Sequence, residues 1–566
     1  MQELTGAQRA RLAIREFKTI ADALAIRGFY RPSGKFGKAL EGCLKDLSPE
    51  IYGSMNDQKV VELSGLEYVI DRLPKGIENA VKIILTDEEQ FEDTPFEKIV
   101  PLKRRRTCYK LNEKEFCFII SRGLSEIYDI LTHLTFLNIE ARKIYRRIQD
   151  DYGKPRLEWN TLEKQICANQ SECGDLDSAL WNLSIILGRT YHETKEVYES
   201  FEKNRTESNS NNGFFSLIYN LGKRVENESH SEDNALVVYL TPSLMNIIGH
   251  QRYGSIWADN IKEMLISLQF QDRPVHIVSA NLHSVVNVLY GYDAVQHSSV
   301  ELKYEKDDLY GFFVEISEKK MDIMGFAEKN GCYPLPDRSG TNIDCQIIDT
   351  EKLETISALP GLNIDMAFIK EKKPVILVMN YAFGVQAFEV MERLLKPLAK
   401  EGNDIVFNFE SVSIMGKAGI LAGQKGDVML ATAHVCEGSS DNYILDNELH
   451  EDDFDDDVDV YTGTMATVLG TSLQNKDVLE MFNKDWKAVG LEMEGGHYQK
   501  AISAAVIKGN IPRDIAIRYA YYASDNPLLT GNTLAAGAMG REGIKPTYMI
   551  TKVILEKILC GKDQGK

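Results

Sequence analysis

The sequence predicts an α/β protein in three parts: a mostly helical N-terminal region (1–203), a small α/β region (214–330) and a C-terminal α/β domain (331–566). In the first part, apolar residues recur at the three- and four-residue spacing of amphipathic helices. In the other two parts, short apolar strands alternate with helical stretches, which is typical of parallel sheets. The length of 566 residues agrees, because one hydrophobic core rarely serves so long a chain.

The helical spacing of the N-terminal region is clearest in residues 117–139. Its most basic segment, 103–106, is expected to be a solvated helix end or loop, with an anion site as the alternative. Residues 204–213 are polar, rich in Asn and Ser and free of apolar side chains. We therefore expect a linker there.

The small α/β region is predicted from two strands, at 235–240 and 275–279, which precede helical stretches at 255–268 and 282–289. This alternation favours a parallel sheet.

The turn after the second of these strands contains Ser279, Ala280 and Asn281, with His283 close behind. Turns in which a strand meets a helix N-terminus often bind phosphate. Ser279 or Asn281 is alternatively no more than the N-cap of the helix, which is the interpretation we favour.

The C-terminal domain is predicted to contain strands at 374–379, 404–408, 428–431 and 515–523, and a helix at 386–396. Its acidic stretch, 451–459, is expected to be a solvated loop. A metal site is the alternative there, although nothing in the spacing defines a coordination geometry.

The composition is acidic, with 65 Lys and Arg against 84 Asp and Glu, a net charge of −19. Such a charge disfavours generic binding to nucleic acid or to an anionic membrane, but it leaves room for a local basic pocket. No apolar run reaches the roughly 18 residues of a spanning helix, and residues 1–16 lack the apolar core of a signal peptide. We expect a cytoplasmic protein with no nucleic-acid or membrane partner.

The nine cysteines are scattered and odd in number, and none forms a CxxC pair. We expect reduced thiols, mostly in the core, rather than disulfides or a zinc site. They are Cys43, Cys108, Cys117, Cys167, Cys173, Cys332, Cys345, Cys436 and Cys560.

Two segments carry residue types that suit a sugar or base. Residues 416–427 are dense in glycine, which lets the backbone approach a ligand closely or simply makes a turn. In the second segment, Glu492 and Glu494 flank Met493. A carboxylate accepts two hydrogen bonds from a vicinal diol, and a thioether packs well on a flat ring. The alternative is a helix start with a solvated pair of glutamates.

A third segment places Ser524 and Asp525 at the end of a predicted strand, just before Pro527. Ligands of open α/β sheets bind outside the carboxyl ends of strands, so Asp525 is a candidate acid. An aspartate near proline is alternatively a common turn residue.

The order and spacing of these segments resemble the purine nucleoside phosphorylase and nucleosidase superfamily, and within it the AMP nucleosidases, over roughly 370–566. The matching residues are Gly416-Lys-Ala-Gly419, Gly426-Asp-Val-Met-Leu-Ala-Thr-Ala-His434, Tyr461-Thr-Gly-Thr-Met-Ala-Thr467, Glu492-Met-Glu-Gly495 and Ser524-Asp-Asn-Pro-Leu528. The resemblance implies a nucleoside phosphorylase-like α/β/α sandwich for this part. It does not reach the residues before about 330.

Carried onto these positions, the resemblance implies that Asp525 hydrogen bonds the purine N7 and protonates it as the base leaves. Glu494 would bind the ribose hydroxyls, and Met493 would pack against the sugar. The strand 375–379, leading to Gly384, would supply backbone donors near a phosphate or the attacking water. The other substrate-binding candidates are Glu492, Ser524, Gly416, Lys417 and Gly419.

The chemistry requires these residue types. Breaking the bond between ribose and base builds positive charge on the sugar and negative charge on the base, which a nearby carboxylate and a general acid stabilise. An aspartate must be protonated to act as that acid. We therefore predict that burial raises the pKa of Asp525.

Two departures from the family pattern affect glycine positions. Ala382-Phe-Gly384 stands where the family has Gly-x-Gly, and Lys417 and Ile420 stand where small residues are usual. Lys417 is either a phosphate contact or a surface lysine.

The favoured function is hydrolysis of the N-glycosidic bond of a purine nucleotide, such as AMP, or of a nucleoside. A phosphorylase that uses phosphate as the nucleophile is the alternative on the same fold. A non-catalytic, regulatory protein that binds purine nucleotides is the alternative from another class, and the altered glycines favour it. The resemblance also implies a homo-oligomer, and neither a metal nor an organic cofactor is expected.

Overall fold

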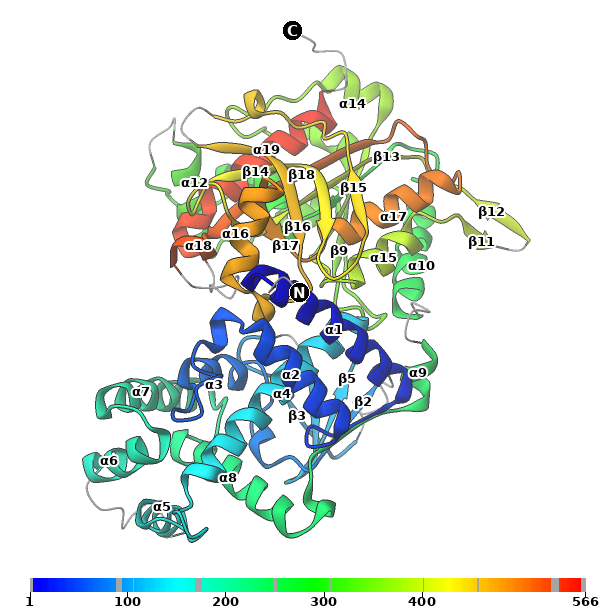
Figure 1. Cartoon of the computed structure of the whole chain (residues 1–566). Coiled ribbons are helices and arrows are strands. Elements are labelled where there is room, and N and C mark those ends of the chain that lie inside the picture. Colours follow the sequence, from blue (N-terminus) through cyan, green and yellow to red (C-terminus); the bar gives the residue numbers. More distant parts are fainter. Residues whose placement is uncertain are drawn as a thin grey trace. The chain divides into compact units, whose positions relative to one another are not determined.

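The computed structural model describes residues 4–87, 94–104, 106–167, 176–247, 252–304, 308–400, 402–455, 458–530 and 539–560. The chain divides into two compact units. Unit 1 is Met1–His250 with Ser472–Val478, and unit 2 is Gln251–Thr471 with Leu479–Lys566. Both units mix helices with a sheet, so the chain is α/β throughout (Figure 1).

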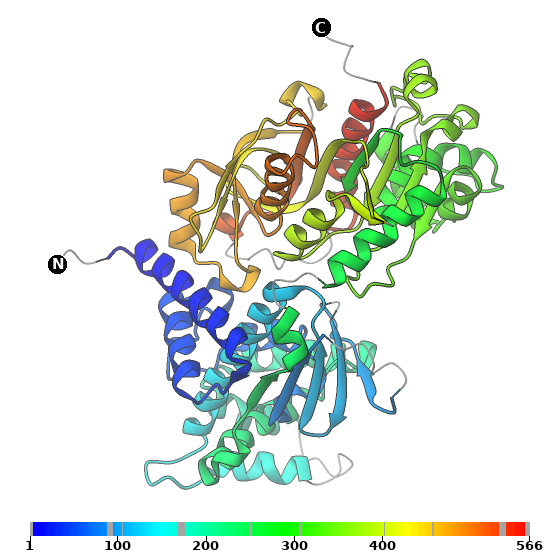
Figure 2. The same cartoon turned by 90° about the vertical axis from the view of Figure 1, so that its right-hand side faces the viewer.

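Unit 1 contains a six-stranded sheet, whose blue and cyan strands lie side by side in Figure 2. In sheet order the strands are β1 (Phe29–Tyr30), β6 (Val237–Leu240), β2 (Lys82–Thr86), β5 (Glu115–Ile119), β4 (Thr107–Asn112) and β3 (Glu97–Ile99). The central strand β2 is parallel to both β5 and β6, and the outer pairings are antiparallel.

The helices of unit 1 are α1 (Gly6–Arg27), α2 (Lys35–Leu47), α3 (Leu63–Ile70), α4 (Gly123–Arg147), α5 (Leu157–Cys167), α6 (Leu176–Leu187), α7 (Tyr191–Ser208), α8 (Phe214–His230) and α9 (Pro242–Ile247). Helices α1 and α7 begin with capping boxes, in which Thr5 pairs with Gln8 and Thr190 with Glu193. Most residues of α4 are buried, so this helix forms the centre of the unit.

The periodic segment 117–139 is not a single helix. Phe118 and Ile119 lie on β5, and α4 begins only at Gly123, whose φ is +63°. A buried strand and a buried helix are both apolar on all sides, so apolar spacing alone did not separate them.

The expected linker at 204–213 is ordered: residues 204–208 end α7, and residues 209–213 form the turn between α7 and α8. Asn209 adopts the left-handed conformation that ends α7. The side chain of Asn211 accepts a hydrogen bond from the Gly213 N–H (2.8 Å), and Asn212 donates to Glu78 (2.7 Å). Asparagine is common in turns because its side chain bonds the nearby backbone, and the same composition is found in linkers.

The basic segment 103–106 lies in a loop, as expected. Its described side chains are ion-paired, with Lys103 exposed and Arg106 buried. Lys103 pairs with Asp71 (2.7 Å), and Arg106, only 5% exposed, pairs with Asp129 (2.6 Å). Arg104 lies 3.4 Å from the same Asp129. Arg105 lies outside the described residues.

The strands expected in the region 214–330 lie in two different sheets. The first, β6, pairs with β2 in unit 1. The second, β7 (Val275–Ser279), pairs with β10 and β13 in unit 2. The two units therefore separate near residue 250 and not near 204–213 or 331.

Unit 2 contains a ten-stranded mixed sheet. Its strands are β7, β8 (Cys332–Leu335), β9 (Cys345–Asp349), β10 (Val375–Met379), β13 (Phe409–Ile420), β14 (Val428–Cys436), β15 (Asn442–Ile444), β16 (Val460–Thr467), β17 (Ala488–Glu492) and β18 (Ala516–Asp525). Five of them close into a ring, because β13 pairs with β18, β18 with β14, β14 with β16, β16 with β17, and β17 again with β13. Strands β7, β10, β9 and β8 extend the sheet from β13.

The helices of unit 2 are α10 (Arg252–Ser267), α11 (Leu282–Gln296), α12 (Leu309–Glu318), α13 (Ile323–Lys329), α14 (Met366–Lys372), α15 (Gln386–Leu394), α16 (Lys476–Asp485, which begins in unit 1), α17 (Gly495–Ile507), α18 (Pro527–Thr530) and α19 (Ile544–Leu559). Two apolar cores line the sheet. Ile277 of β7 lies in the core with α10, α15 and α17, and its neighbour Val278 lies in the core with α11, α12 and α19. Alternate residues of a strand point to opposite faces, so helices cover both faces of the sheet here.

The expected strand at 404–408 is only partly a strand. Residues Asn403–Ile405 form β12, which pairs with β11 (Leu398–Lys400) in a separate hairpin. The next long strand, β13, instead runs through the glycine-rich residues 416–420, so that the turn comes after them. Apart from these, the strands and the helix predicted after residue 331 are confirmed.

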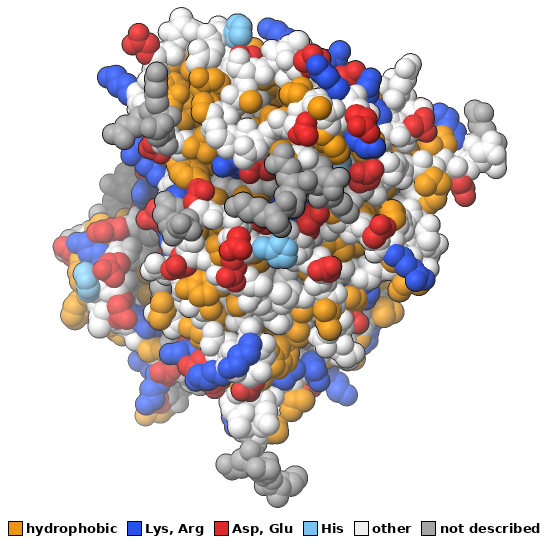
Figure 3. Space-filling model, turned by 90° about the horizontal axis from the view of Figure 1, so that it is seen from above, with side chains coloured by type: hydrophobic (Ala, Val, Ile, Leu, Met, Phe, Trp, Pro, Cys, Tyr) orange, Lys and Arg blue, Asp and Glu red, His pale blue; other side chains and the backbone are white. Residues whose placement is uncertain are grey.

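Of the acidic stretch, Glu451–Asp453 form one turn of 3-10 helix, and residues 456–457 lie outside the described part. Within the described ranges, no cluster of His, Cys, Asp and Glu is arranged to hold a metal. Acidic and basic side chains are interspersed on the face shown in Figure 3.

The cysteines whose side chains are described are free thiols, and all but the half-buried Cys560 are buried. Cys173 and the side chain of Cys167 lie outside the described residues. Over the part of the chain that the structure covers, no helix has both the length and the apolar character needed to cross a membrane.

Candidate functional site

The residues predicted to carry the chemistry meet along the second half of β13. Gly419 of β13 lies opposite Asp525 of β18 on one side and Leu491 of β17 on the other. Neighbouring strands lie about 4.8 Å apart, so Asp525 and Leu491 are about 10 Å apart across β13. The three segments, distant in sequence, are thus neighbours in the sheet.

Asp525 ends β18 as a buried carboxylate, 7% exposed. Its Oδ1 accepts a hydrogen bond from the Ser524 hydroxyl (2.6 Å), and its Oδ2 has no hydrogen-bond partner among the described residues. Burial raises the pKa of the Asp525 carboxyl, while the Ser524 bond and the charges of Lys417 and Lys425 act against that rise. Asp525 is therefore easier to protonate than an ordinary aspartate, which an acid catalyst needs.

The position of Asp525 is set by the turn around it. The register of β13 against β18 shifts between Ala418 and Gly419, and this irregularity falls beside Ser524. The Ser524 hydroxyl also lies 3.2 Å from the Ala418 carbonyl oxygen, and Asn526 donates to the Gly423 carbonyl (2.7 Å). The strand end is thus held on both sides of the acid.

Glu492 is buried at the end of β17, 3% exposed, and is not part of a solvated pair. Its carboxylate accepts hydrogen bonds from the Thr467 hydroxyl (2.5 Å) and from the backbone N–H groups of Glu494 (2.5 Å) and Gly495. Burial by itself raises the pKa of Glu492, but these bonds together with His434, 3.4 Å away, leave it below its usual value. In this structure Glu492 anchors the start of α17.

Glu494 is half-buried and lies at the N-terminal end of α17. Its Oε1 accepts a hydrogen bond from the Gly384 N–H (2.9 Å). Gly384 lies in the turn after β10 with φ +55°, a conformation that favours glycine. The expected backbone donor of this turn therefore contacts Glu494 directly.

The remaining predicted residues lie on this stretch of β13 or at the start of α17. Met493 is buried. A Cβ on Gly416 would lie 3.6 Å from the Tyr381 ring, so this glycine leaves room beside an aromatic side chain. Lys417 is exposed and lies opposite Tyr522 on β18, while Gly419 is buried opposite Asp525.

Sequence reasoning did not assign the side chains that connect these segments to that role. Tyr498 of α17 hydrogen bonds Ser279 at the end of β7 (3.2 Å). Thr467, at the end of β16, holds Glu492, and Tyr381 follows β10. Each is a polar residue at or near a strand end or helix start, which is the only signal the sequence offers for them. Asn281 caps α11 through the Ser284 N–H (3.0 Å), as favoured from the sequence.

A family model described as "Family of unknown function (DUF6909)" matches residues 38–310 and 312–560, and so covers both units. The chain belongs to this family. The search of curated proteins found no match.

Among solved structures, the chain is similar to a putative methylthioadenosine nucleosidase from Weissella paramesenteroides, with 12% identity, a TM-score of 0.30, and coverage of 51% of this chain and 100% of that one. It is also similar to the futalosine hydrolase of Helicobacter pylori, with 13% identity, a TM-score of 0.29, and coverage of 51% of this chain and 98% of that one. A third similar structure is the 5'-methylthioadenosine/S-adenosylhomocysteine nucleosidase of Helicobacter pylori, with 14% identity, a TM-score of 0.30, and coverage of 51% of this chain and 98% of that one. At this distance the likenesses carry no weight for the chemistry of this chain.

Proposed function

We propose that unit 2 hydrolyses the N-glycosidic bond of a purine nucleoside or nucleotide, with Asp525 as the general acid. The observation that carries the proposal is the Asp525 carboxylate, buried at a strand end with Oδ2 unpartnered within the described residues and its pKa raised by burial. A protonated Oδ2 can donate to a ring nitrogen of the leaving base, where negative charge develops.

In the proposed reaction, water adds to the sugar carbon C1′ as the bond to the base nitrogen breaks. The proton of Asp525 moves to N7 of the base, water gives up one proton to solvent, and Asp525 is reprotonated from solvent. Glu494 accepts hydrogen bonds from the ribose hydroxyls, a role supported by its half-buried carboxylate at the start of α17. Met493, Gly416 and Gly419 form the surface beneath the sugar and base.

The test is to incubate the full chain with AMP, adenosine, inosine and guanosine, with and without inorganic phosphate, and to measure free base by chromatography. We expect base release that does not depend on phosphate. Asp525→Asn should lower the rate by about 10²- to 10⁴-fold, the usual contribution of a positioned general acid. Asp514→Asn, at an exposed position just before β18, is the matched control and should leave the rate unchanged.

The alternatives give different results in the same assay. Acceleration by phosphate with formation of ribose 1-phosphate would make the protein a phosphorylase. Tight binding of a substrate without release of base would make it a nucleotide-binding regulatory protein. Base release at an equal rate from Asp525→Asn would remove Asp525 from the mechanism.

A further inference from the structure

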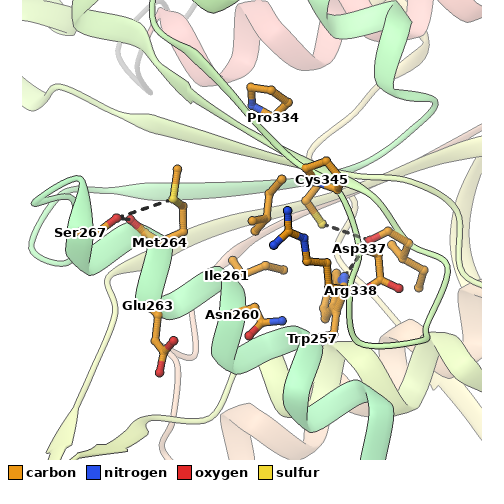
Figure 4. A pocket seen from close by; sticks show the side chains of 13 residues that line it. Trp257, Asn260, Ile261, Glu263, Met264, Ser267, Pro334, Asp337, Arg338 and Cys345 are labelled. Atoms are coloured by element: carbon orange, nitrogen blue, oxygen red, sulfur yellow. Dashed lines mark hydrogen bonds between the residues drawn. The ribbon is translucent and has the colours of Figure 1, made fainter. Parts of the chain in front are cut away.

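The cavity that stands out in unit 2 lies away from the candidate site. It has a volume of about 570 Å³, a size typical of pockets for small organic ligands, and lies between α10 and β8 with the loop that follows β8 (Figure 4). None of Asp525, Glu494 or the other predicted site residues lines it.

The walls of the cavity are largely apolar and rigid. Trp257, Ile261 and Met264 line it from α10, and Pro334 and Leu335 line it from β8. The Trp257 indole N–H donates to the Ile343 carbonyl oxygen (2.8 Å), which fixes the ring against the opposite loop. Such walls suit a ligand with an apolar body, because side chains that are already fixed lose little conformational entropy when the ligand binds.

Arg338 is the one basic side chain among the residues that line the cavity, and it is exposed. Two acidic residues, Glu263 and Asp337, also line it. The Arg338 guanidinium points into the cavity in Figure 4. Within the described ranges, no carboxylate pairs with it. The adjacent Asp337 is engaged by the backbone N–H groups of Ser339 (2.9 Å) and Asn342 (2.8 Å). An unpaired guanidinium beside an apolar wall is suited to a carboxylate, sulfonate or phosphate group.

The loop that carries Arg338 also reaches the candidate site. The Asn380 N–H donates to the Asp344 carbonyl oxygen (3.0 Å), and the Gln386 amide donates to the Thr341 carbonyl (2.8 Å). Asn380 and Gln386 flank the turn whose Gly384 N–H holds Glu494.

We infer that this cavity binds a small organic anion with an apolar body, and that the loop 336–344 transmits its occupancy to the Gly384 turn. The anion pairs with Arg338 while its body packs against Trp257 and Met264. A ligand that pairs with Arg338 restrains this loop, and the bonds from Asn380 and Gln386 connect the loop to the turn that contacts Glu494, which gives the two sites a coupling free energy. The inference stands whether or not unit 2 is a nucleosidase.

The binding test compares two fluorescent probes with the same two aromatic groups. They are 8-anilinonaphthalene-1-sulfonate, an anion, and N-phenyl-1-naphthylamine, which is neutral. We expect the anion to bind the full chain, and Arg338→Gln to weaken it by about tenfold or more, because a hydrogen bond to a charged group is worth about 1.5–3 kcal/mol. Arg513→Gln, an exposed arginine of unit 2 outside the cavity, should bind like the wild type. Equal affinity of Arg338→Gln, or equal affinity for the two probes, would overturn the site.

The coupling test follows backbone hydrogen exchange, which needs no activity. Saturating sulfonate probe should slow exchange in the peptide 380–388, where the Asn380 N–H reports the bond to Asp344. The same probe at the same concentration should have no such effect on Arg338→Gln, and α19 should be unchanged in both proteins. Unchanged exchange in 380–388, with the probe bound, would overturn the transmission.

Discussion

Two acidic side chains at the candidate site, Asp525 and Glu492, are given different roles by their surroundings. Asp525 and Glu492 are both buried, but only Glu492 is enclosed by donors on both oxygens. Burial without full hydrogen bonding favours the neutral acid, whereas several donors favour the carboxylate. The pKa values of the two therefore move in opposite directions, as a proton donor and a structural anchor require.

Asp525→Asn should unfold at a higher temperature than the wild type at pH 7 to 8. The pKa of Asp525 is higher in the folded than in the unfolded chain, so the wild type loses stability as pH rises through the folded value. Asparagine stays neutral and avoids that loss. The difference should shrink toward pH 4, where the acid is protonated in more of the folded molecules.

Scanning calorimetry between pH 4 and pH 8 measures this effect. Asp514→Asn, which changes an exposed carboxylate, should show no such pH dependence. A melting temperature of Asp525→Asn below that of the wild type at pH 8 would contradict the raised pKa.

At the scale of elements, the start of α17 joins the ring of strands to the turns of the extended sheet. Glu492 holds the first N–H groups of the helix and contacts β16 through Thr467, while Glu494 contacts the turn after β10 through Gly384. A Cβ on Gly495 would lie 2.3 Å from His434, so only glycine lets the helix begin so close to β14. The carboxylates of Glu492 and Glu494, two residues apart in the chain, thus bond to different parts of the structure.

Substitution of the two glutamates should separate stability from substrate binding. Glu492→Gln should lower the free energy of unfolding by about 1–3 kcal/mol, because buried donors lose their acceptor. The pKa of Glu492 is lowered in the folded state, so its contribution is present at neutral pH and is lost as pH falls through the folded value. Glu494→Gln should keep the stability and raise the KM for nucleoside.

Denaturant titration and steady-state kinetics on both variants check this prediction. Each variant serves as the matched control of the other, since the same change is made two residues apart. Equal losses of stability in both would contradict the division of roles.

At the scale of the molecule, the chain consists of two units, each with its own sheet. In unit 1 the buried Lys143 pairs with Glu140 (2.9 Å) and donates to the carbonyl oxygens of Ser54, Met55, Asp57 and Val60. This lysine holds a whole loop in place. Units with separate hydrophobic interiors are expected to respond separately to substitution.

Lys143→Met should destabilise unit 1 by about 3–5 kcal/mol, because it leaves the buried Glu140 carboxyl without its cation and four loop carbonyl oxygens without their donor. The double variant Lys143→Met/Glu140→Leu should recover only the part of the loss that comes from the unpaired carboxyl, because the loop carbonyl oxygens still lack their donor. Hydrogen exchange should report faster opening in α4 and residues 54–62, with unit 2 strands such as β10 unchanged. Full stability of the single variant would show that the ion pair contributes nothing.

The local pattern of apolar residues was sufficient to predict several strands of unit 2. The strands at 275–279, 375–379 and 428–431 lie where their apolar runs predict, because a strand buried on both faces needs such a run. It did not predict the ordered turn at 209–213 or the ion pairs made by 103–106. There the outcome depended on partners such as Glu78, Asp71 and Asp129, which are distant in the chain.

By itself, the sequence determined the mixed α/β class, the positions of β7, β10, β14 and β18 in unit 2, and which short segments carry carboxylates, glycines and a thioether. The tertiary structure alone decided that those segments meet across β13, that Glu492 faces inward while Glu494 faces the Gly384 turn, and that Arg338 enters a separate cavity. The physical reason is the distance along the chain over which each effect acts. Propensity and periodicity act over a few neighbouring residues, whereas burial, hydrogen-bond partners and pKa values depend on side chains that only folding brings together.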